Sequence, residues 1–92
     1  MAKRINNAQY EAMAGAFPAV AEEIESLWKS YWLSMKSDPN AVVFRQYIGG
    51  RLDGVQETMA ILGHGDYSGF IESASNKMER EVKGCKKEQE KQ

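Results

Sequence analysis

One long stretch between two turn signals, residues 41–62, constrains the fold of this chain more than any other feature. Apolar residues recur in it every three or four positions, which places their side chains on one face of an α-helix. The first such stripe comprises Phe44, Ile48, Leu52, Val55, Met59 and Leu62, and a second comprises Val43, Tyr47, Gly50, Gly54 and Ile61. A helix that is apolar on two sides is packed on two sides. We therefore expect this helix to lie in the middle of a bundle or to join a core to a partner.

Two helices are predicted before this one. Asn7 is a suitable N-cap for a short helix over residues 8–14, and Pro18 suits the first turn of a longer helix over residues 18–36. The inner stripe of the longer helix comprises Val20, Ile24, Leu27, Tyr31 and Met35. Residues 37–40 hold a proline between Asp and Asn, which is turn chemistry. So short a connection predicts that the two long helices form an antiparallel hairpin.

After a glycine-rich break, the chain resumes as a last helix capped by Asp66 or Ser68. Its apolar positions form a narrow, heptad-like seam with charged residues on both flanks. The seam comprises Tyr67, Phe70, Ile71, Ala74, Met78, Val82 and Cys85. The sequence therefore predicts one all-α domain over residues 1–92, a three- to four-helix bundle with frayed ends at residues 1–6 and 86–92.

Charge and composition disfavour several classes of function. The chain has 12 basic and 13 acidic residues and a formal net charge of -1, so it lacks the basic excess that nucleic acids and anionic membranes attract. Its single cysteine provides neither an internal disulfide nor a zinc site, and no apolar run is long enough to cross a bilayer. An uncharged run ending in Ala19-Val20-Ala21 mimics a signal-peptide cleavage site, but polar residues interrupt its approach. We expect a cytoplasmic protein with no nucleic-acid partner, no membrane partner and no cofactor.

Two glycines lie one turn apart inside the central helix, in the pattern Gly50-Arg51-Leu52-Asp53-Gly54. Each glycine costs about 1 kcal/mol of helix stability relative to alanine, so a close contact should offset this cost. We expect the notch to receive another helix, either in the core or at a dimer interface. A groove for a flat ligand is the alternative, because glycine is also used where a backbone meets a ligand.

The aromatic cluster of Trp28, Tyr31 and Trp32 is the most interaction-like feature, since Trp and Tyr dominate binding hot spots. Trp28 and Tyr31 fit the core, whereas Trp32 lies on the shoulder of the inner stripe and Leu33 lies beyond it. The predicted partner-binding residues are Trp28, Trp32, Leu33, Tyr47, Gly50 and Gly54.

The loop Gly63-His64-Gly65-Asp66 lies where the last helix begins. Free N–H groups at such a place attract anions, although a loop with left-handed glycines and an Asp cap explains the same residues. The candidate anion-binding residues are Arg45, Arg51, Gly63, His64 and Gly65. A lone histidine lacks the other ligands that a metal needs, and no Ser/His/Asp, Cys/His or paired-carboxylate arrangement is visible. We therefore expect no metal site and no enzyme.

A local resemblance concerns residues 47–54, with the string Tyr47-Ile48-Gly49-Gly50-Arg51-Leu52-Asp53-Gly54, and the following Met59-Ala60-Ile61-Leu62. These segments resemble parts of small helical accessory proteins encoded by bacteriophages and related mobile elements. The resemblance covers about a fifth of the chain and carries no catalytic residues. It implies action by binding a host or competitor component, or by sequestering a small signal, in the host cytoplasm.

Two functional hypotheses follow from these features. The first is a non-catalytic, self-associating regulator or inhibitor that binds a protein partner through Trp32, Leu33 and the edges of the central helix. The second is an oligomeric protein that sequesters a nucleotide-like or other anionic small molecule through Arg45, Arg51, His64 and the glycines, with a site shared between subunits.

Overall fold

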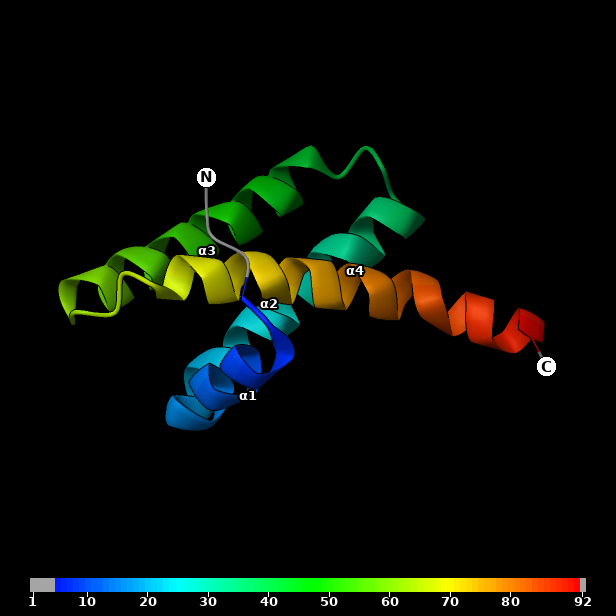
Figure 1. Cartoon of the computed structure of the whole chain (residues 1–92). Coiled ribbons are helices and arrows are strands. Elements are labelled where there is room, and N and C mark those ends of the chain that lie inside the picture. Colours follow the sequence, from blue (N-terminus) through cyan, green and yellow to red (C-terminus); the bar gives the residue numbers. More distant parts are fainter. Residues whose placement is uncertain (1–4, 92) are drawn as a thin grey trace.

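The computed structural model describes the backbone of residues 5–91 and the side chains of residues 5–84 (Figure 1). This part of the chain forms four helices and no strand, which confirms the predicted all-α bundle. The helices are α1 (Asn7–Ala16), α2 (Pro18–Ser37), α3 (Val42–Ile61) and α4 (Tyr67–Lys91). None of the described helices has both the length and the apolar character that a bilayer span requires.

Helix α1 starts one residue earlier than the sequence predicted, because a capping box forms at Asn6. The Asn6 side chain accepts a hydrogen bond from the Gln9 backbone N–H at 2.8 Å, and the Gln9 side chain accepts one from the Asn6 N–H at 2.9 Å. The prediction that Asn7 is the cap was therefore wrong. The helix also continues past Gly15, since a single glycine lowers helix stability without ending a helix.

Helices α2 and α3 form the predicted antiparallel hairpin (Figure 1). Arg45, near the start of α3, holds the turn that joins them. Its guanidinium donates hydrogen bonds to Ser34 Oγ at 3.1 Å, to the Asp38 carbonyl at 3.0 Å and to the Pro39 carbonyl. These bonds satisfy carbonyl groups that the turn leaves without a helical partner.

The junction between α3 and α4 turns on Gly63, which adopts a left-handed φ of 93°. The Gly63 N–H bonds the Ala60 carbonyl at 3.0 Å and the His64 N–H bonds the Met59 carbonyl at 2.7 Å. This pair of bonds is a Schellman motif, in which glycine takes the left-handed position at low steric cost. The left-handed loop is thus confirmed at Gly63. Helix α4 continues to Lys91, beyond the predicted end near residue 85.

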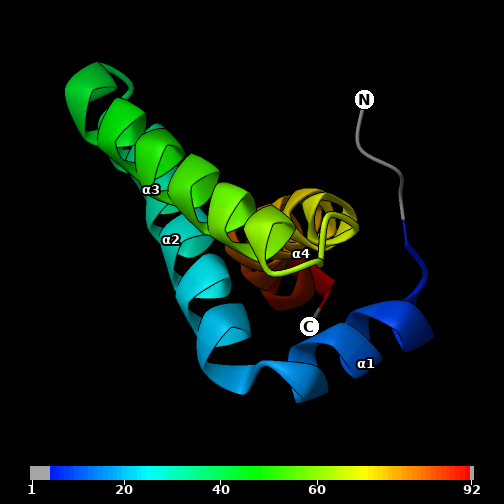
Figure 2. The same cartoon turned by 90° about the vertical axis from the view of Figure 1, so that its left-hand side faces the viewer.

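The core is organised around α2 and α4, each of which contacts the other three helices (Figure 2). The predicted seam of α4 is buried at every position from Tyr67 to Val82, while the side chain of Cys85 lies outside the described part. The most deeply buried large side chains are Tyr67, Phe70, Ile24 and Ile48. The expectation that α3 lies in the middle of the bundle was therefore wrong.

Helix α3 is covered by its own chain on one side only. Ile48, Leu52 and Met59 of the first stripe are buried. Phe44 and Leu62, at the two ends of that stripe, are exposed because the core covers α3 only from Ile48 to Met59. The second stripe is exposed from Val43 to Ile61. At 100° per residue, its mean direction is roughly 125° around the helix from that of the first stripe, so the contacts that bury the first stripe leave the second open.

Candidate protein-binding surface

The outer face of α3, defined as Val43, Tyr47, Gly50, Gly54 and Ile61, is an apolar helix face that the described bundle leaves open. Val43 is 79% exposed, Tyr47 56% and Ile61 84%. Val42, Phe44 and Leu62, at the two ends of α3, are also exposed. Figure 2 shows α3 in front of α2 and beside α4, with no other helix on its near side. Contiguous exposed apolar surface of this kind is typical of interaction sites.

The two glycines of the outer face form a notch that nothing in the bundle fills. A methyl group added at Gly50 or at Gly54 would meet no atom within 4 Å outside the local helix backbone. The notch opens into a shallow groove of about 550 Å³, whose other wall is formed by Ala19 and Val20 of α2. Close packing within the described chain therefore does not account for the pair of glycines.

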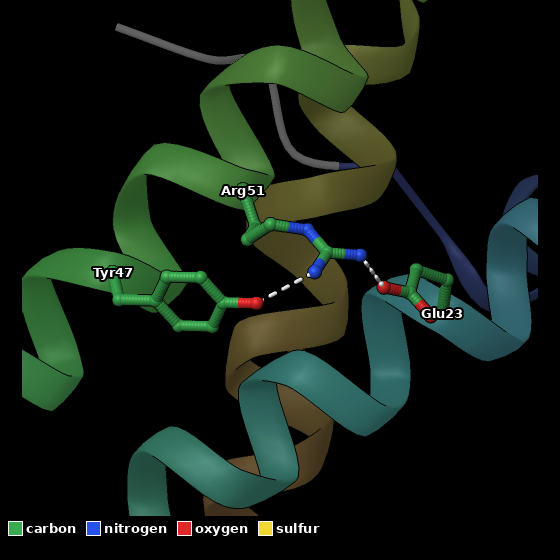
Figure 3. A network of polar contacts seen from close by, with 3 residues as sticks. All are labelled: Glu23, Tyr47 and Arg51. Atoms are coloured by element: carbon green, nitrogen blue, oxygen red, sulfur yellow. Dashed lines mark hydrogen bonds and ion pairs between the residues drawn. The ribbon is translucent and has the colours of Figure 1, made fainter.

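A polar network borders the outer face on the side of α2 (Figure 3). Arg51 donates hydrogen bonds to the Tyr47 hydroxyl at 2.7 Å and to the Glu23 carboxylate at 2.7 Å. The Tyr47 hydroxyl, and then the negative charge of Glu23, raise the pKa of Arg51 above its ordinary value. Because Arg51 is already paired within the chain, it restrains Tyr47 and ties α3 to α2 instead of standing as a free cation.

The two tryptophans connect α2 to α4. The Trp28 indole N–H donates to the Ile71 carbonyl at 2.9 Å, and the Trp32 indole N–H donates to the Ser75 carbonyl at 3.0 Å. Lys83 lies over the Trp32 ring, with Nζ at 5.8 Å from the ring centre. These contacts make both side chains parts of the helix–helix contact. Of the predicted aromatic surface, Leu33 is the residue whose side chain faces solvent.

The candidate anion-binding residues do not meet in one site within the chain. Arg45 is bonded into the turn after α2, and Arg51 is paired with Glu23. His64 lies at the far end of α3, edge-on to the Phe17 ring at 4.9 Å between centres. At 1.5 Å per residue, Arg45 and His64 are separated by roughly 28 Å along the helix.

A partly buried polar network that the sequence did not predict joins α1, α2 and α4. The Glu25 carboxylate accepts hydrogen bonds from the Tyr10 hydroxyl at 2.5 Å and from Lys77 Nζ at 2.9 Å. Burial by itself would raise the pKa of Glu25, but the bonds from Tyr10 and Lys77 outweigh it and lower that pKa. Burial, and next the bond to Glu25, raise the pKa of Tyr10.

This network ties three helices together through one carboxylate. Tyr10 and Lys77 lie 15 and 52 residues from Glu25 in the sequence, so no local spacing predicts this network. Among the described residues, no buried polar side-chain atom lacks a hydrogen-bond partner, and no group of three potential metal ligands converges. Comparison with families of known proteins, with curated proteins and with solved structures found no match.

Proposed function

We propose that this chain is a non-catalytic, self-associating regulator or inhibitor that binds a protein partner. The observation that supports this proposal most is where the exposed apolar side chains lie. The large hydrophobic side chains that the described structure exposes all lie between residues 33 and 62, on the α2–α3 hairpin. They are Leu33, Met35, Val42, Val43, Phe44, Tyr47, Ile61 and Leu62. A surface that gathers its apolar side chains on one hairpin is typical of a docking surface.

The exposed side chains fall into two separate surfaces. Leu33 and Met35 lie in the last turns of α2, roughly 160° apart around the helix. A hollow of about 420 Å³ lies on the Met35 side and is also lined by Trp32 and Val82. The remainder belong to α3 and its cap. We assign the end of α2 to the protein partner, because an apolar hollow rimmed by Lys36 and Lys83 resembles the apolar core and polar rim of an interface. Action as a phage accessory protein in the host cytoplasm is part of this proposal.

Affinity capture with matched variants tests the assignment. A tagged chain is expressed in the cells that encode it, and co-purified proteins are quantified for the wild type, for Leu33→Glu and for Ala12→Glu. Both changes place the same charge on an exposed helical position, but Ala12 lies on α1. We expect one protein to be enriched with the wild type and with Ala12→Glu, and to fall about tenfold with Leu33→Glu, the loss of a typical interface contact.

The result that contradicts the proposal is equal capture by all three chains, or capture of no protein above background. In that case heat stability with nucleotides decides the remaining hypothesis. A ligand that binds only the folded state raises the melting temperature by mass action. We expect no rise with millimolar nucleotides, because the cationic residues do not converge within one chain.

A further inference from the structure

The outer face of α3 has an internal symmetry that core packing does not require. Val43 precedes Leu52 by nine residues and Ile61 follows it by nine, while Gly50 and Gly54 lie two residues on either side. The eighteen residues between Val43 and Ile61 are five full helical turns, so both side chains project in the same direction. Read from either end, Val43, the two glycines and Ile61 present an apolar residue, a glycine, a second glycine and an apolar residue. Tyr47 stands outside this symmetry, because its mirrored position is Glu57.

A face with this order is complementary to itself when two copies lie antiparallel. A twofold axis makes residue i of one copy meet residue j of the other and the reverse. With the axis at Leu52, Val43 of each copy meets the partner's Ile61, and the glycines of both copies coincide at the crossing. The absence of side chains there lets the two helix backbones approach closely. The apolar ends of both helices then touch without a gap at the centre.

We propose that the outer face of α3 binds a second copy of this chain, antiparallel, about a twofold axis through the notch between Gly50 and Gly54. This inference rests on the self-association included in the proposed function and names its surface and geometry. Val42 and Phe44 lie beside Val43, and Leu62 lies beside Ile61, so each end of the paired helices forms one apolar cluster from both copies.

Charge and area agree with a weak dimer of this chain. Arg51, the cation nearest the axis, is paired with Glu23 of its own chain, so the symmetry does not bring two unpaired cations together. Each exposed apolar side chain offers roughly 100 Å². The three on the outer face, counted on both copies, hide on the order of 600 Å². The three beside it are turned about 100° from the contact and add only part of their area, so the total stays below the roughly 1,200 Å² of a standard specific interface. A dimer that dissociates on dilution is the expected form.

Mass measurement and disulfide cross-linking of the full chain test the proposal. Sedimentation equilibrium across concentrations on the order of 1 to 100 μM should show mass rising from the chain mass of 10.4 kDa to twice that value. Ile61→Asp should keep the mass of one chain at every concentration. Ala12→Asp, on an exposed position of α1 and so away from the outer face of α3, is the matched control and should dimerise as the wild type does. Circular dichroism establishes that both variants are folded.

Cross-linking distinguishes the antiparallel arrangement from others. In a Cys85→Ser background, the variants Val43→Cys and Ile61→Cys are oxidised separately and as an equal mixture. The antiparallel pair predicts a disulfide dimer in the mixture alone, because identical positions are roughly 27 Å apart across the axis. A homotypic disulfide in either single variant, or a monomer at all concentrations, overturns the proposal.

Failure here and failure of the proposed function give different results. A monomeric chain whose capture is still lost with Leu33→Glu removes the dimer and leaves the partner-binding function. A dimer with the expected cross-link that captures no protein removes the partner-binding function and leaves the dimer.

Discussion

The junction at Glu25 makes the stability of the bundle depend on pH in a calculable way. In the folded chain, Glu25 accepts hydrogen bonds from Tyr10 and Lys77, and its pKa lies below the ordinary value of 4.5. The unfolded chain therefore binds a proton at higher pH than the folded chain does. The resulting stabilisation is fully present above about pH 4.5, the ordinary value for an unfolded chain, and is lost as the pH falls through the folded pKa.

The size of the effect follows from the two hydrogen bonds. A hydrogen bond to a charged group contributes about 1.5 to 3 kcal/mol when it is well shielded. The side chains of Lys77 and Glu25 are 41% and 29% exposed, so solvent screens the pair, and we take about 2 kcal/mol for both bonds together. In a domain of this size, that loss lowers the melting temperature by roughly 10 °C.

Thermal unfolding of Glu25→Gln between pH 3 and 8 measures this contribution. At pH 7 the variant should melt roughly 10 °C below the wild type, and the difference should shrink as the pH falls below about 4.5. The matched control is Glu23→Gln, which removes a surface pair with Arg51 and should cost at most about 1 kcal/mol. Equal losses in the two variants, or a difference that is constant with pH, would refute the reasoning.

Two further predictions concern the buried tyrosines and Gly54. Burial raises the pKa of Tyr10 and of Tyr67, so alkaline difference spectroscopy should show tyrosines that ionise only above pH 10, as the bundle unfolds. Tyr10→Phe should remove one of them, and a normal titration of every tyrosine would contradict this. Gly54→Leu should raise the melting temperature of the single chain, because a Cβ there meets no atom within 4 Å and leucine favours helix by about 1 kcal/mol relative to glycine, while the larger side chain blocks the dimer. A less stable monomer would show that the notch is occupied within the chain.

The helices were predictable because each carries local signals. The apolar seam of α4 and the proline turn before α3 depend on residues close together in the sequence, and both are confirmed. The role of α3 was not predictable by the same means. Periodicity shows that a helix has two apolar faces, but not whether both are covered by its own chain, and the second face of α3 is open.

Side-chain partners across helices were the other part that sequence could not supply. The Glu25 junction joins residues from three helices, and the bonds of Trp28 and Trp32 reach 43 positions along the chain to carbonyl groups of α4. Every residue has a backbone carbonyl, so the sequence does not indicate which carbonyl accepts such a bond. The start of α1 does carry a local signal, because Asn6 and Gln9 have the spacing of a capping box.

The placement of the indoles has a practical consequence for spectroscopy of this protein. Both tryptophans of the chain lie where α2 meets α4, with their N–H groups bonded to α4. Tryptophan emission therefore reports the separation of these two helices. A fluorescence melt therefore measures the unfolding of each molecule, whereas a light-scattering titration measures its association with other copies.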